Sequence, residues 1–182
     1  MLRPLTAEPS GSQTAGPFFR MALHRPDWAD LTPHLKGTPV RIVGRLLDGD
    51  GVPVPDGMLE IWQADANGQY ADGSLSGFGR VCTETDGGFA ITTVVPGAVR
   101  DAAGALHAPH VNVHIFARGL LRHLFTRIYF ADRPTENAED VALKAVPADR
   151  RGTLLAKPDG DGGYRFDIIL QGRGETVFFD LR

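Results

Sequence analysis

Glycine and proline recur along the whole chain and divide it into short apolar segments. The 182 residues include 22 glycines and 13 prolines. Turn-forming clusters such as residues 48–51 (DGDG) and 65–68 (DANG) return roughly every ten residues. Glycine adopts positive φ and aspartate bonds its own backbone, so these clusters favour tight turns between strands. The spacing therefore predicts a mainly β protein, a β-sandwich of many short strands.

The apolar segments between the turns alternate as strands do. Residues 57–63 place Leu59 and Ile61 on one face and Met58, Glu60 and Trp62 on the other. Weak helical spacing predicts a short helix within residues 138–151, between late strands. The predicted strands are residues 40–47, 57–63, 89–95, 110–117, 124–131, 152–156, 164–170 and 175–179.

The first 39 residues differ in pattern from the rest. Prolines recur throughout residues 1–39 and would each break a helix. We therefore expect an extended N-terminal arm over residues 1–39, with a helical turn near residues 27–31, and the β-sandwich domain over residues 40–182. An arm of this length lies either on its own sandwich or on a partner.

Composition limits the classes of function. The formal net charge is -3, so no basic footprint indicates nucleic-acid binding. No stretch approaches the about 20 apolar residues of a membrane helix, and residues 1–17 lack a signal-peptide layout. Cys82 is the single cysteine, which leaves no disulfide within the chain and favours a cytoplasmic location. We expect Cys82 to be a small buried apolar residue.

A few residues are candidates for chemistry. His107, His110, His114 and Tyr70 could bind a metal, and His110, Asn112 and His114 project from one face of a predicted strand. A polar face at an interface or in solvent gives the same pattern. The sequence has no HExxH, paired CxxC or GxSxG motif. Residues 77–80 (GFGR) lack the strand–turn–helix context of a phosphate loop.

Arg127 lies in the strongly apolar segment 124–130 (LFTRIYF). A charged residue there either points to solvent or is held in a pocket for an anion. The planar guanidinium donates two parallel hydrogen bonds and so suits a carboxylate.

Residues 59–70 (LEIWQADANGQY) resemble the signature of the intradiol ring-cleavage dioxygenases. Residues 77–80, Thr83, 86–87 and 95–97 (VPG) continue the resemblance, as do 127–130 (RIYF). Residues 164–168 and 174–179 are similar to the ends of the protocatechuate-cleaving members. The resemblance covers about residues 10–182. It implies a β-sandwich and an O2-dependent cleavage of protocatechuate to 3-carboxy-cis,cis-muconate.

The resemblance also implies which positions would hold the ferric ion. In the family, two tyrosinates, two histidines and a hydroxide bind Fe(III), a hard cation that anionic phenolates stabilise. The corresponding positions here are Tyr70, Val99, Asn112 and His114. Valine cannot coordinate and an amide is a poor replacement for imidazole, so we expect no metal in this chain and regard the four positions as vestigial. Tyr70 and His114 would then remain as ordinary polar core or interface residues.

This pattern resembles the α-type chain of two-chain members of the family. Their homologous β chain carries the Fe(III), and the two chains form a higher αβ oligomer around a large interface. Residues 12–18 (SQTAGPF) are similar to the α-type arm, which implies that the arm contacts the partner. Thr14, Gly16, Pro17 and Arg127 are then expected to wall the partner's substrate pocket. Arg127 would lie near the substrate carboxylate or support the groups that bind it.

Two other hypotheses remain open from the sequence. The turn, Pro-Val-Pro and alternating strand of residues 49–63 also occur in non-enzymatic β-sandwich adhesion or carrier modules. A homomeric dioxygenase could instead use His107 or His110 as a replacement ligand, and would then bind iron in the isolated chain.

Overall fold

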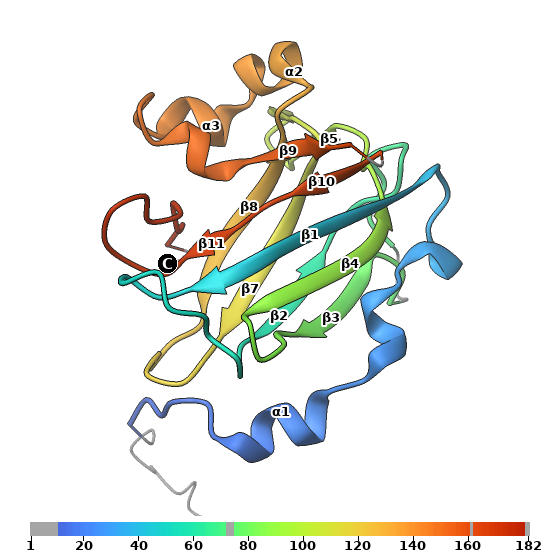
Figure 1. The fold of residues 1–182 in the computed structure, drawn as a ribbon. Coiled ribbons are helices and arrows are strands. Elements are labelled where there is room, and N and C mark those ends of the chain that lie inside the picture. Colours follow the sequence, from blue (N-terminus) through green and yellow to red (C-terminus); the bar gives the residue numbers. More distant parts are fainter. Residues whose placement is uncertain (1–10, 72–74, 161, 181–182) are drawn as a thin grey trace, which may run out of the picture.

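The computed structural model describes residues 11–71, 75–160 and 162–180, and it shows two β-sheets packed face to face (Figure 1). The first sheet is built around β1 (Pro39–Leu47). β1 pairs antiparallel with β4 (Gly88–Val94) and parallel with both β10 (Gly163–Arg165) and β11 (Ile168–Ile169). Thus segments from both ends of the chain meet in one sheet.

The second sheet has the order β8 (Leu124–Phe130), β7 (His110–Phe116), β2 (Met58–Trp62) and β3 (Phe78–Cys82), all antiparallel. β9 (Leu155–Asp159) pairs parallel with β8 and antiparallel with β10. One strand therefore belongs to both sheets and closes the sandwich along that side.

A small hairpin stands apart from the two sheets. β5 (Val99–Arg100) pairs antiparallel with β6 (Leu106–His107), and Val99 lies opposite His107. The hairpin leads directly into β7 and so brings His107 close to the start of that strand.

The core lies between the facing sheets. Leu59 and Ile61 of β2 are buried in the same cluster as Ile42 of β1 and Ile91 of β4. Met58, Glu60 and Trp62 alternate with them, which confirms the predicted alternation of this strand. Burial of an aliphatic side chain contributes about 1.5–3 kcal/mol, so this cluster supplies a large part of the folding free energy.

The N-terminal segment contains more helix than the prolines suggested. α1 (Pro17–Leu23) begins with proline at its first turn, where a missing N–H costs nothing. It is followed by two single-turn 3₁₀ helices, η1 (Pro26–Ala29) and η2 (Thr32–His34). Leu31 is 2% exposed and joins the sandwich core, so this part of the segment packs on its own domain.

The predicted helical segment between late strands is present. It forms α2 (Pro134–Glu139), α3 (Val141–Ala145) and η3 (Arg151–Leu154), which lie at one end of the sandwich (Figure 1). The Asp140 side chain accepts a hydrogen bond from the Leu143 N–H at 2.7 Å and caps α3.

Three predicted strands were wrong in part or whole. Residues 164–170 form two short strands, β10 and β11, with a break at residues 166–167. Residues 152–154 belong to η3, and β9 begins only at Leu155. Residues 175–179 form no strand, because their backbone bonds go to scattered partners: Val177 N to the Thr153 hydroxyl and Phe179 N to the Phe125 carbonyl. β3 was not predicted, since its residues were considered only as a glycine loop.

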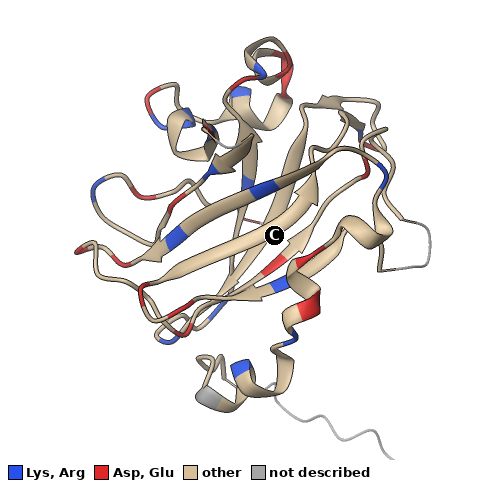
Figure 2. Ribbon diagram, turned by 45° about the vertical axis from the view of Figure 1, so that its right-hand side comes forward, with Lys and Arg blue, Asp and Glu red and all other residues tan. Residues whose placement is uncertain are grey.

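Charged residues of both signs are spread over loops, helices and strands (Figure 2). This mixture agrees with the small net charge of -3. Within the described ranges, no helix has the length and apolar character needed to cross a membrane. Cys82 is buried, as predicted.

Candidate functional site

The outer face of the second sheet carries the polar residues of β7. Val111, Val113 and Ile115 point into the core, so His110, Asn112 and His114 share the opposite face. The predicted common face is therefore confirmed.

Asn112 connects two of the side chains singled out in the sequence. Its amide nitrogen donates to the Tyr70 hydroxyl at 2.9 Å, and its amide oxygen accepts from the Arg127 Nε at 3.1 Å. Asn112 and Arg127 are directly opposite each other on β7 and β8. Tyr70 stacks on Trp62 with ring centroids 5.9 Å apart. Burial raises the pKa of Tyr70, so its phenol is neutral near pH 7 despite the nearby guanidinium.

The Arg127 guanidinium continues the network away from Asn112. A terminal nitrogen lies 3.2 Å from the His107 Nδ1 and 3.4 Å from the Tyr129 hydroxyl. Because a guanidinium only donates, the His107 Nδ1 accepts here. The His107 Nε2 then donates to the Asp101 carboxylate at 3.4 Å. Arg127 is thus held within the chain from two sides.

A fully buried carboxylate ends the network. Asp140 has no exposed surface, accepts from the Tyr129 hydroxyl at 3.1 Å and lies 3.6 Å from the His107 Nδ1. Its oxygens also accept from the backbone N–H of Ala108 and Leu143. Sequence reasoning missed Asp140, although an aspartate directly before a helical segment is a recognised capping signal.

His110 is buried beside the same network. Its Nδ1 lies 2.7 Å from the Ala108 carbonyl oxygen, so this nitrogen donates and the ring is held as one neutral tautomer. Burial first, and then the charge of Arg127, lower the pKa of His110 to about 4. His110 is therefore uncharged at neutral pH.

The other two vestigial positions have contacts of their own. The His114 ring packs against His123 and Phe125, at centroid distances of 5.0 and 4.9 Å. Burial, and then His123, lower the pKa of His114. Val99 faces His107 in the β5–β6 hairpin.

This donor set does not fit a ferric ion. Val99 has no donor atom, and the Asn112 amide is engaged on both sides. The permanent positive charge of Arg127 is hydrogen-bonded to Asn112, where it repels any second cation. Across residues 11–71, 75–160 and 162–180, no group of three or more His, Cys, Asp and Glu side chains is arranged to hold a metal.

The four predicted pocket residues fall in two places. The Thr14 hydroxyl accepts from the Gly119 N–H at 2.8 Å and lies 3.4 Å from the Ala117 carbonyl, while Gly16 and Pro17 begin α1. Arg127 lies opposite Asn112, five residues before Ala117, or about 16 Å along a strand. Within this chain the arm residues and Arg127 are therefore separate.

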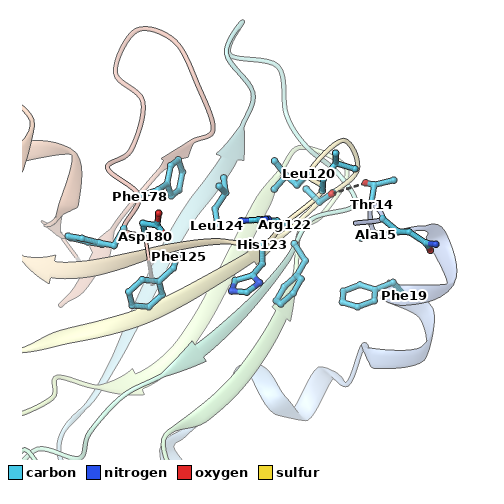
Figure 3. A pocket seen from close by; sticks show the side chains of 15 residues that line it. Thr14, Ala15, Phe19, Leu120, Arg122, His123, Leu124, Phe125, Phe178 and Asp180 are labelled. Atoms are coloured by element: carbon cyan, nitrogen blue, oxygen red, sulfur yellow. Dashed lines mark hydrogen bonds between the residues drawn. The ribbon is translucent and has the colours of Figure 1, made fainter. Parts of the chain in front are cut away.

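A groove of about 800 Å³ lies beside the arm residues (Figure 3). Thr14, Ala15 and Phe19 form one wall, and residues 120–125 and 178–180 form the other. The Phe19 ring packs against Phe116 at 5.4 Å. Sequence reasoning missed this groove, because its walls are far apart in the chain.

Comparison with known proteins places the chain in a family. A family model described as "Dioxygenase" matches residues 25–172. The dioxygenase domain of a carbohydrate-binding fusion protein from Streptomyces sp. SirexAA-E has a similar fold, with a TM-score of 0.60 and 26% identity over 91% of this chain and 99% of that one. The chain belongs to the intradiol ring-cleavage dioxygenases, a family that uses ferric iron.

Two relatives narrow the comparison within the family. The protocatechuate 3,4-dioxygenase alpha chain of Pseudomonas putida is 43% identical, over 93% of this chain and 95% of that protein. The protocatechuate 3,4-dioxygenase beta chain of Burkholderia cepacia is 30% identical, over 77% of this chain and 67% of that protein. The similarity to the alpha chain is thus higher and covers nearly the full length of both chains.

Proposed function

We propose that this chain is the α-type, non-iron-binding subunit of a protocatechuate 3,4-dioxygenase. The assembled enzyme would cleave protocatechuate with O2 between its two hydroxyl-bearing carbons and form 3-carboxy-cis,cis-muconate. The observation that carries the proposal is the Tyr70–Asn112–Arg127 contact, in which an amide stands at a position where the family resemblance requires an iron ligand and a cation is hydrogen-bonded to that amide. The near full-length similarity to an alpha chain supports it.

The Fe(III) would lie in a homologous β-type partner, with which this chain forms a higher αβ oligomer. The two relatives named as alpha and beta chains support a pair of homologous subunits. The large exposed side chains of α1, Phe18 at 78% and Met21 at 72%, support burial of this helix against another chain. The single buried cysteine supports a cytoplasmic location.

The contribution of this chain to the partner's pocket would come from the arm. Thr14 fixes the start of α1 to the β7–β8 turn, which would hold Gly16 and Pro17 in a defined position at the interface. Arg127 enters the proposal as a residue that supports neighbouring groups rather than as a direct ligand of the substrate carboxylate. Its Nε and one terminal nitrogen are already bound within the chain.

A test compares the full chain produced alone with the full chain co-produced with its β-type partner. We expect protocatechuate-dependent O2 uptake and one iron per αβ pair from the co-produced complex, and neither iron nor uptake from the chain alone. Ring cleavage by the isolated chain with its own stoichiometric iron would refute the proposal. It would favour a homomeric enzyme that uses His107 or His110 as a ligand.

A further inference from the structure

The positive charge of Arg127 lies at the centre of the hydrogen-bond network that joins Tyr70, Asn112, His107, Tyr129 and Asp140 on the outer face of the second sheet. The Arg127 guanidinium contacts the Asn112 amide oxygen at 3.1 Å, the His107 Nδ1 at 3.2 Å and the Tyr129 hydroxyl at 3.4 Å. Each of these atoms is a lone-pair donor that a metal ion could also use. The two remaining polar rings, Tyr70 and His110, lie close enough for the charge of Arg127 to affect their pKa values.

The network also contains the opposite charge. Asp140 is fully buried and lies next to two partners of Arg127. It accepts a hydrogen bond from the Tyr129 hydroxyl at 3.1 Å and lies 3.6 Å from the His107 Nδ1. A buried carboxylate needs a nearby cation or several hydrogen bonds. Arg127 donates to the Tyr129 hydroxyl, which in turn donates to Asp140, so the two opposite charges are linked through Tyr129.

We propose that the Arg127 guanidinium is the built-in cation of this site: it organises the surrounding oxygen and nitrogen donors and closes the site to metal ions. Loss of ligand residues at Val99 and Asn112 is then only one of two barriers to metal binding. The guanidinium remains charged at every physiological pH, so the second barrier is permanent. This inference concerns the side chains of this chain alone and stands whether or not the chain is an α-type subunit.

The proposal makes a distinction that ligand loss alone does not make. If missing ligands were the only barrier, Val99→Tyr and Asn112→His together would create a metal site. If Arg127 is a second barrier, that double variant stays empty until the charge is removed. A divalent ion about 5 Å from a fixed positive charge is disfavoured by on the order of 100-fold or more in affinity at an intermediate dielectric constant.

The experiment uses the full chain and Co²⁺, whose visible bands report the coordination geometry. Three variants are compared with the parent: V99Y/N112H, V99Y/N112H/R127Q and V99Y/N112H/R127K. We expect about one Co²⁺ per chain after gel filtration only for R127Q, and at least about 100-fold weaker binding for the variants with Arg or Lys. Equal Co²⁺ binding with and without the charge would overturn the proposal, as would a folded R127Q triple variant that binds none.

A second readout covers the case in which the triple variant fails to fold. In Arg127→Gln alone, loss of the nearby cation should raise the ionisation midpoint of Tyr70, while Arg127→Lys should leave it near the parent value. Near-ultraviolet difference spectra give this midpoint, and Tyr70→Phe identifies the signal. An unchanged Tyr70 midpoint in Arg127→Gln would show that the guanidinium does not organise the site.

Discussion

Replacement of Asp140 by alanine tests the buried network most directly. The carboxylate is inaccessible to solvent and accepts three hydrogen bonds: from Leu143 N at 2.7 Å, Ala108 N at 2.8 Å and the Tyr129 hydroxyl at 3.1 Å. Alanine offers no acceptor to any of them. We therefore expect Asp140→Ala to lower the free energy of unfolding by much more than a surface substitution.

The size of the effect follows from these three bonds. Loss of the cap to Leu143 costs about 1 kcal/mol. A buried donor left without an acceptor costs about 1–3 kcal/mol, and Ala108 N and the Tyr129 hydroxyl are two such donors. Because the contributions share one network and are not additive, we expect a total of about 4 kcal/mol. Asp140→Asn keeps one acceptor oxygen and should cost about half as much.

Urea unfolding, monitored by tryptophan fluorescence, measures the difference in free energy of unfolding between the parent and each variant. Trp28 and Trp62 report on unfolding because both pack within the folded domain. Asp149→Ala is the matched control, because Asp149 is exposed in the same connecting region and should change stability by less than about 0.5 kcal/mol. A loss below about 1 kcal/mol for Asp140→Ala, at an unchanged denaturant slope, would refute the reasoning.

Three further predictions concern other sites. In Gly44→Ala, the new Cβ would lie 1.7 Å from the Phe166 carbonyl oxygen, so no folded protein should accumulate in soluble expression. The control Gly152→Ala should express normally, because its new Cβ would have no atom within 4 Å. Thr83→Val removes the hydroxyl that accepts from a buried backbone N–H at 2.9 Å and should cost about 1–3 kcal/mol in thermal unfolding. Burial lowers the pKa of His110 from 6.5 to about 4, so the unfolded chain binds a proton between these pH values that the folded chain does not. Stability should therefore fall by about 3 kcal/mol as the pH drops from 6.5 to 4, and a pH series of unfolding curves for His110→Gln should lack this slope.

Local sequence patterns were sufficient for most of the sandwich. The alternation in residues 58–62 correctly assigned the faces of β2, because side-chain direction in a strand depends only on position along the backbone. The prolines before residue 26 wrongly predicted an extended backbone without helix. Pro17 starts α1 rather than preventing it, because proline is restricted in the interior of a helix and not at its first turn.

Closing strands were harder to predict than internal ones. Residues 175–179 have the apolar content of a strand, yet their backbone bonds to Thr153 and Phe125 instead of to a neighbouring ladder. β3 contains Gly79 and directly follows Gly77, so it looked like a loop, but pairing with β2 over five residues fixes it as a strand. In both cases the available partners, and not the local composition, decided the structure.

The sequence by itself determined the turn spacing, the family motifs and the absence of usable ligands at Val99 and Asn112, because each is a property of a residue type at a position. Only the tertiary structure decided what Arg127 does. Its partners Asn112 and His107 lie 15 and 20 residues away, and they meet it only when β8 aligns beside β7 and the β5–β6 hairpin folds back. Asp140 enters through the cap of α3, which packs near the same end of the sandwich. Hydrogen bonds depend on distance in space, so this charge network is set by the fold and not by spacing in the chain.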